Sequence, residues 1–104
     1  METIIIGKLE VTTCDIGTMY WPEAKMCCEA LGPGWRLPTL EELSVLYQHK
    51  EIIGGFSDDY CWSATEVSPD AVWTKVFSSG WNDQDDKTAA PYPYYVRAVR
   101  SVET

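Results

Sequence analysis

Four side chains that offer oxygen ligands crowd five consecutive positions in the last quarter of the chain. They are Asn82, Asp83, Asp85 and Asp86. A calcium ion takes about six to eight oxygen ligands, and carboxylates and amides are common among them. The cluster is therefore a candidate calcium site, and the alternative is an acidic turn that contacts only solvent.

The last third of the sequence also mixes aromatic residues with small polar ones, at positions expected in loops or on the outward side of strands. Tyrosine and tryptophan supply rigid contact area in binding surfaces, and asparagine, serine and aspartate supply hydrogen bonds. This mixture favours a surface that binds a protein or a glycan, although some of the tyrosines could merely cover the sheet. The candidate ligand-binding residues are Glu66, Ser68, Asp70, Thr74, Trp81, Asn82, Asp83, Gln84, Asp85, Tyr92 and Tyr94.

Residues suited to catalysis are few. His49 is the only histidine, so a Ser/His/Asp set cannot be assembled convincingly, and the chain has no glycine-rich phosphate-binding loop. The four cysteines form no Cys-x-x-Cys pair, which argues against zinc. We expect small, buried, reduced thiols, no enzymatic activity and, apart from calcium, no cofactor.

The charge balance excludes several classes of partner. Sixteen acidic and eight basic residues give a formal net charge of −8. A field of that sign repels a nucleic-acid backbone and an anionic membrane surface. The first residues do not form a secretory signal peptide, and no apolar run is long enough to span a bilayer. We therefore expect a protein made in the cytoplasm, which a phage particle or another assembly could still display; its oligomeric state stays open.

The first half of the chain predicts a strand pair followed by two helices. β-Branched residues from Ile4 to Thr13 favour a strand or hairpin. A helix is expected from Pro22 to Leu31, because apolar side chains recur there at helical spacing and a glycine follows. A second helix is expected from about Thr39 to Lys50, and Thr39 and Glu42 match the capping-box pattern at its start.

The second half predicts strands joined by polar turns. Strands are expected over Tyr60–Thr65, Ala71–Phe77 and Tyr94–Arg100, with a polar, turn-rich segment over residues 81–93. The order is an α+β fold with helices beside an antiparallel sheet. We expect a single domain over residues 1–104, in which 1–56 are mainly scaffold and 57–100 supply strands and ligand-binding loops.

Several motifs run in order along nearly the whole chain. They are Gly34-Trp35-Arg36-Leu37-Pro38-Thr39, Glu42-Leu43, Gly54-Gly55-Phe56, Tyr60-Cys61-Trp62-Ser63-Ala64-Thr65-Glu66, Ala71-Val72-Trp73, Phe77, Gly80, Lys87 and Tyr95-Val96-Arg97-Ala98-Val99-Arg100. As a set they resemble the bacterial domain family typified by the C-terminal domain of the Legionella collagen-like adhesin. The resemblance implies a C-type-lectin-like fold, related to formylglycine-generating domains. In that fold two helices flank a small antiparallel sheet, and the N- and C-terminal strands are adjacent.

The resemblance also implies a class of function. Members often bind glycans or proteins, and similar domains are the targets of diversity-generating retroelements, which vary residues of the C-terminal third. Two versions of a non-catalytic binding module follow: a diversified receptor-binding surface, or a fixed carbohydrate-binding lectin. An inert interaction domain is the third alternative. Formylglycine-generating enzymes use two cysteines in their C-terminal half, where this chain has only Cys61.

Two further features are interpreted through the same resemblance. Trp81-Asn82-Asp83 matches a tripeptide whose Asn and Asp ligate calcium in calcium-dependent C-type lectins, but the partner motif and the disulfides of those lectins are missing. The recurring arginines Arg36 and Arg97 are expected in structural salt bridges, with Glu42 or Glu66 as the acidic partner.

Overall fold

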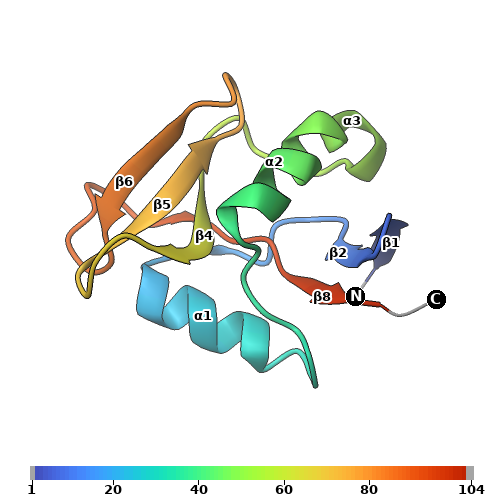
Figure 1. Ribbon diagram of the computed structural model, residues 1–104, viewed down its shortest axis with the longest axis horizontal. Coiled ribbons are helices and arrows are strands. Elements are labelled where there is room, and N and C mark those ends of the chain that lie inside the picture. Colours follow the sequence, from blue (N-terminus) through green and yellow to red (C-terminus); the bar gives the residue numbers. More distant parts are fainter. Residues whose placement is uncertain (1, 103–104) are drawn as a thin grey trace.

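The computed structural model describes residues 2–102, whose strands and helices form an α+β fold (Figure 1). The strands are β1 (Thr3–Ile6), β2 (Leu9–Thr12), β3 (Thr18–Met19), β4 (Tyr60–Glu66), β5 (Ala71–Val76), β6 (Asn82–Asp86), β7 (Tyr94–Tyr95) and β8 (Val99–Ser101). The helices are α1 (Trp21–Glu29), α2 (Leu40–Gln48) and α3 (Lys50–Ile53). The α+β class is confirmed, with a short third helix beyond the two that the sequence predicts.

The smaller sheet has the strand order β1-β2-β8 and joins the two ends of the chain. β1 and β2 form a hairpin that turns at Gly7, whose φ of 60° lies in the left-handed region that glycine adopts most easily. β8 pairs with β2, where Val99 lies opposite Val11. The C-terminal strand therefore lies beside the N-terminal hairpin as expected, although its partner is β2 and not the first strand.

The larger sheet has the strand order β3-β7-β4-β5-β6. Strands β4, β5 and β6 are antiparallel neighbours, whereas β7 runs parallel to β4. The sheet is therefore mixed, and the expectation of a purely antiparallel sheet is wrong. β6 is an edge strand that pairs with β5 on its inner side.

The two longer helices begin close to where the sequence predicts. Thr39 caps α2, because its hydroxyl accepts the Glu42 N–H at 3.1 Å and the Glu42 carboxylate accepts the Thr39 N–H at 2.9 Å. α2 ends at Gln48 and does not continue to Lys50, since His49 leaves the helical region with a φ of −109° and a ψ of 16°. Within residues 2–102, the helices are too short and too polar for any of them to cross a membrane.

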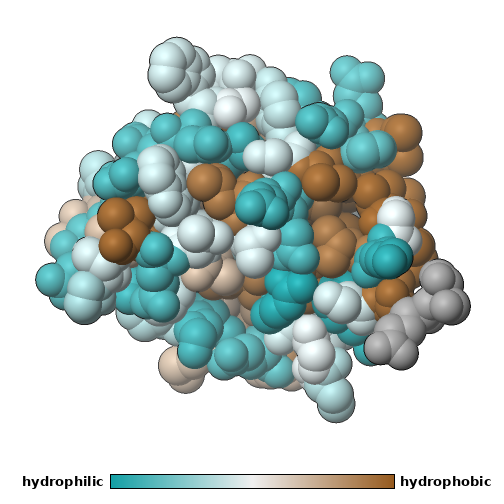
Figure 2. Space-filling view, in the orientation of Figure 1, coloured by the Kyte–Doolittle hydropathy of each residue, from teal (hydrophilic) through white to brown (hydrophobic). Residues whose placement is uncertain are grey.

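Two groups of buried side chains form the core between the helices and the sheets. One lies between α1 and the larger sheet and includes Trp21, Cys28 and Trp62. The other lies between α2 and the smaller sheet and includes Leu43 and Val99. Hydrophobic residues that stay at the surface gather mainly over α3 and the β1–β2 hairpin, whereas the β5–β6 end is mainly hydrophilic (Figure 2).

Arg97 is a fully buried cation that fixes the crossing between the two sheets. Its guanidinium donates to Asp15 Oδ1 at 3.1 and 3.2 Å, and to the carbonyl oxygens of Thr12 and Gly54 at 2.6 and 3.2 Å. The Phe56 ring covers it at 3.7 Å from Cζ. Because each guanidinium nitrogen meets an acceptor and one face meets a ring, this buried charge is well compensated.

The arginine salt bridges agree with the prediction in one case and contradict it in the other. Arg36 pairs with Glu42 at 2.6 Å, as expected. Arg97 pairs with Asp15, so neither expected partner is right for it. Glu66 pairs with Lys87 instead.

The C-terminal half departs from the predicted strands at two places. Residues 82–86 form β6, although the sequence predicts only turns over residues 81–93. Five backbone pairs with β5, from Ala71 to Lys75, outweigh the low strand propensity of aspartate and asparagine. The predicted closing strand Tyr94–Arg100 is split, because β7 belongs to the larger sheet and β8 to the smaller one.

All four cysteines are free thiols. Cys28 and Cys61 are buried, and desolvation raises the pKa of each to about 12. Cys14 and Cys27 are exposed, so the expectation of four buried thiols is wrong for these two. α1 turns Cys27 outward, because the buried stripe of the helix runs through other positions.

Candidate ligand-binding face

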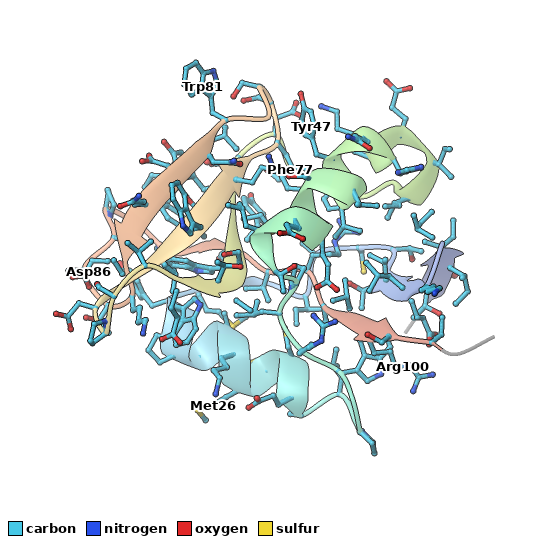
Figure 3. All side chains as sticks on the ribbon, in the orientation of Figure 1. Met26, Tyr47, Phe77, Trp81, Asp86 and Arg100 are labelled. Atoms are coloured by element: carbon cyan, nitrogen blue, oxygen red, sulfur yellow. The ribbon has the colours of Figure 1, made fainter. Side chains whose placement is uncertain are left out.

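The β5–β6 turn holds Trp81 in an exposed position. Gly80, with a φ of 80°, donates its N–H to the Val76 carbonyl at 2.7 Å, and Val76 donates to the Trp81 carbonyl at 2.8 Å. A Cβ on Gly80 would lie only 2.8 Å from the Tyr47 ring, so the turn packs closely on α2. These bonds fix the backbone of Trp81, while its side chain is 73% exposed and points away from the body of the protein (Figure 3).

The side chains of β6 alternate between the two faces of the larger sheet, as strand geometry requires. Asp83 and Asp85 share one face with Thr74, whose hydroxyl donates to Asp85 Oδ2 at 2.9 Å. Asn82 lies on the other face, where its Oδ1 accepts a hydrogen bond from Lys75 Nζ at 2.7 Å. The acidic stretch therefore divides into two sets of side chains with different neighbours.

Beside the face with Asp83 and Asp85 lies a cluster of three tyrosines, Tyr60, Tyr92 and Tyr94, which we call the tyrosine cluster. The Tyr94 ring stacks on Tyr60 with centroids 4.8 Å apart and meets Tyr92 edge-on at 5.1 Å. Tyr94 is 2% exposed and Tyr92 is 42% exposed, so the cluster leads from the core to the surface. Aromatic pairs in these geometries favour rigid packing.

Each hydroxyl of the tyrosine cluster donates to a different carboxylate. Tyr94 donates to Asp85 at 3.0 Å and Tyr92 donates to Asp59 at 2.9 Å. Tyr60 makes a longer bond of 3.4 Å to Asp83. The three rings therefore pack together, and the carboxylates of Asp59, Asp83 and Asp85 lie along their hydroxyl ends, which we call the acidic edge.

The surroundings raise the pKa of all three tyrosines. Burial is the largest cause for Tyr60 and Tyr94, followed by nearby aspartates, whereas for Tyr92 the hydrogen bond to Asp59 is the largest cause. The phenols therefore stay neutral and keep donating at physiological pH. The negative charge of this face remains on the carboxylates.

An open groove of about 480 Å³ lies where the turn and the tyrosine cluster meet. It is lined by Tyr60, Val76, Ser79, Trp81, Asn82 and Asp83. No protein-family model and no curated protein matches this chain. The groove combines aromatic rings with carboxylate and amide groups, which are the groups that ligand-binding sites use.

The structure separates the predicted ligand-binding residues into groups. Trp81, Asn82 and Asp83 line the groove, and Tyr92 and Asp85 lie in or against the tyrosine cluster. The remaining exposed residues lie elsewhere: Gln84 is on the face of β6 opposite Asp83, and Glu66, Ser68 and Asp70 lie around the β4–β5 turn, at the other end of β5.

Two predicted residues are not at the surface. Thr74 is 0% exposed and Tyr94 is 2% exposed, so the expectation that both face outward is wrong. Thr74 lies on β5, which has a neighbouring strand on each side, and Tyr94 fills the space between Trp62 and Tyr60. Both residues hold the Asp85 carboxylate in place, because their hydroxyls donate hydrogen bonds to it.

The four candidate calcium ligands do not converge. Asn82 and Asp86 project from one face of β6, and Asp83 and Asp85 from the other. Asp86 Oδ1 is occupied by the backbone N–H groups of Thr88 and Ala89. Among residues 2–102, no three His, Cys, Asp or Glu side chains are grouped so as to hold a metal ion. The expected turn is a strand, which divides the four side chains between its two faces, and calcium binding at these residues stays a prediction.

Several residues of the groove are absent from the predicted set. Tyr60 begins β4, and the sequence alone gives no reason to separate it from the buried residues that follow. Ser79 and Val76 enter the groove only because β6 folds back on β5. Asp59 was detectable in principle, since it follows another aspartate directly before an aromatic strand.

Proposed function

We propose that this chain is a non-catalytic ligand-binding domain of the C-type-lectin-like type, and that the groove is its binding site. The observation that carries the proposal is the exposed Trp81 ring beside Tyr60 and Asp83 at the rim of a groove. Tryptophan and tyrosine are enriched among the residues that dominate binding energies, and they act in pockets next to hydrogen-bonding groups. The groove supplies both kinds of group.

The preorganisation of the face supports the same proposal. The turn hydrogen bonds hold the backbone of Trp81, and the tyrosine cluster holds the ring of Tyr60 from behind. A ligand that binds to such a surface orders few side chains, so less conformational entropy opposes binding.

The C-type-lectin-like assignment rests on the family motifs and on the arrangement of the chain. The N-terminal hairpin and the C-terminal strand share one sheet, helices lie beside the sheets, and the candidate face comes from the second half of the chain. These features are compatible with the fold that the motifs imply.

We further propose that the face is diversified between copies of the gene. Trp81 is exposed on a turn and Gln84 on an edge strand whose pairing uses backbone groups, so these two side chains can vary without disturbing the core. Sequencing the DNA that flanks the gene tests this proposal. A near-copy of the codons for residues 60–100, differing only at adenines and lying beside a reverse transcriptase, is the expected result; a flank without either contradicts it.

A fixed carbohydrate-binding lectin is the second candidate. Sugar rings stack on tryptophan and tyrosine faces and hydrogen-bond to flanking carboxylates and amides, and the groove combines Trp81 with Asn82 and Asp83. A glycan array with and without calcium tests this candidate. Binding to one glycan class by every natural copy of the domain would favour the lectin over a diversified surface.

Binding to arrays of glycans and bacterial surface proteins should depend on Trp81. We expect Trp81→Ala to abolish the binding of whichever ligand is found, because the largest exposed ring of the groove is lost. Met26→Ala is the matched control, since Met26 is 67% exposed on α1, across the molecule from Trp81 (Figure 3). Full binding by Trp81→Ala would place the site elsewhere.

A further inference from the structure

Three cations of this chain occupy the same kind of environment, in which each lies over an aromatic ring and also pairs with a carboxylate. Arg97 lies 3.7 Å from the centre of the Phe56 ring and pairs with Asp15. The other two are Arg100, between Trp35 and Glu10, and Lys87, between Trp21 and Glu66. A ring face and a carboxylate both attract a cation, and their contributions combine when solvent is partly excluded.

The groove presents the same pair of groups to the outside. Trp81 and Tyr60 supply rings, and the Asp83 carboxylate lies at hydrogen-bond distance from the Tyr60 hydroxyl. Five ion pairs form among the described residues, and none of them includes Asp59, Asp83 or Asp85. Within residues 2–102, these three carboxylates therefore form no ion pair with an arginine or a lysine.

Lys75 is a basic residue that hydrogen-bonds to Asn82 in the lining of the groove, but its ammonium lies away from the rings of Trp81 and Tyr60. It is buried, and its ammonium donates to Gly80 O at 3.1 Å and Asn82 Oδ1 at 2.7 Å, below the turn. Its ammonium also lies 5.7 Å from the Tyr47 ring. This cation supports the back of the turn and leaves the rings and the carboxylate of the groove free for a ligand.

We infer that the groove binds a cationic side chain of a protein partner, with arginine preferred over lysine. The guanidinium stacks on Trp81 or Tyr60 and donates to the Asp83 carboxylate, as Arg97 does with Phe56 and Asp15. Arginine is favoured because its planar group can stack and donate two parallel hydrogen bonds, which an ammonium cannot. The net charge of −8 also attracts a basic surface during encounter. The inference rests on the proposed ligand-binding function and adds the chemistry of the ligand to it.

The test uses blocked pentapeptides with a single arginine, lysine or citrulline between glycines. Citrulline keeps the length and planarity of arginine and removes its charge. The ¹⁵N-labelled chain is titrated with each peptide, and the indole N–H resonance of Trp81, identified by its loss in Trp81→Ala, is followed by NMR. We expect the arginine peptide to shift this resonance at concentrations about tenfold lower than the citrulline peptide, because a charged hydrogen bond is lost.

Two variants of equal charge separate the groove from the general acidic field. Asp83→Asn should weaken binding of the arginine peptide about tenfold. Asp70→Asn, at the other end of β5, should leave it unchanged, since Asp70 is exposed and does not line the groove. Equal urea midpoints for both variants and the parent chain show that the fold is intact. Equal weakening by the two variants would overturn the inference, because the field and not the groove would then attract the peptide.

The failure of this inference differs from the failure of the proposed function. If the citrulline and arginine peptides bind equally, or if neither binds while a glycan or protein still requires Trp81, the site stands and its preference for a cation is wrong. If array ligands bind Trp81→Ala as well as the parent chain, the site itself is wrong.

Discussion

Gly80→Ala should destabilise the protein by an amount that can be worked out from the turn. Gly80 has a φ of 80°, and an added Cβ would lie 2.8 Å from Tyr47 Cε2 and 3.0 Å from Cζ. The left-handed conformation costs an alanine about 1–2 kcal/mol, and overpacking costs about 1–3 kcal/mol. Because alanine also restricts the unfolded chain, about 0.4–1 kcal/mol is recovered. The expected net loss of unfolding free energy is about 1–5 kcal/mol.

The Tyr47 ring cannot move away freely, which is why the overpacking persists. It meets Phe77 edge-on at a centroid distance of 5.7 Å, and the Lys50 ammonium lies 4.7 Å from its centre. Gly7→Ala is the matched control, since Gly7 has a φ of 60° and an added Cβ there meets nothing within 4 Å. It should cost only about 1 kcal/mol.

Urea unfolding of the two variants measures both free energies, and the slope with denaturant should stay unchanged. A double-mutant cycle with Tyr47→Ala then isolates the contact, and it should recover most of the difference between Gly80→Ala and Gly7→Ala. Equal costs for Gly80→Ala and Gly7→Ala would refute the close packing of the turn on α2. In that case only the hydrogen bonds of the turn, and not its packing on Tyr47, would hold Trp81 in place.

Three further predictions concern the scaffold. Burial alone would raise the pKa of Glu42, but the hydrogen bonds from Arg36 and Thr39 hold it below its ordinary value of 4.5. The ionised carboxylate therefore stabilises the fold above that pH, and this contribution is lost as the pH falls through the lowered pKa. Acidification from about pH 5 to about pH 3 should therefore reduce the unfolding free energy of the parent chain more than that of Glu42→Gln, and parallel pH curves would contradict this. A thiol reagent at about pH 8 should label only Cys14 and Cys27 in the native protein and all four cysteines in denaturant; rapid native labelling of Cys28 or Cys61 would contradict their burial. Tyr94→Phe should cost about 1–2 kcal/mol in urea unfolding, because Asp85 loses a buried donor, and a neutral result would show that this bond does not stabilise the face.

Local features of the fold were predictable because their causes lie within a few residues. The capping box of Thr39 and Glu42, the glycine after the first helix and the strand at Tyr60 all follow from neighbouring side chains. Arg36 found its expected partner for the same reason, since Glu42 lies one helical turn inside the helix that begins beside it. Short-range chemistry decides such features.

The features that failed depend on distant partners. Asn82–Asp86 has the composition of a turn, and it becomes a strand because β5 offers a free edge. Arg97 meets Asp15, which is separated from it by 82 residues of chain, and no local pattern indicates this pairing. The candidate site shows the same limit. Trp81 and Asp83 were predicted from their residue types, whereas Tyr60 lies beside them only because β4 pairs with β5.

The first and last strands of the fold, β1 and β8, share the smaller sheet, whereas the β5–β6 hairpin lies at the opposite side of the molecule (Figure 1). A support attached through either of these end strands lies on the other side of the molecule from the hairpin that carries Trp81 (Figure 1). Several copies on one support then present parallel grooves to the same target surface. Linked sites gain about 10²–10⁴-fold in avidity without any new contact, so the side-chain binding proposed for the groove could be weak at one site and still hold a particle through many.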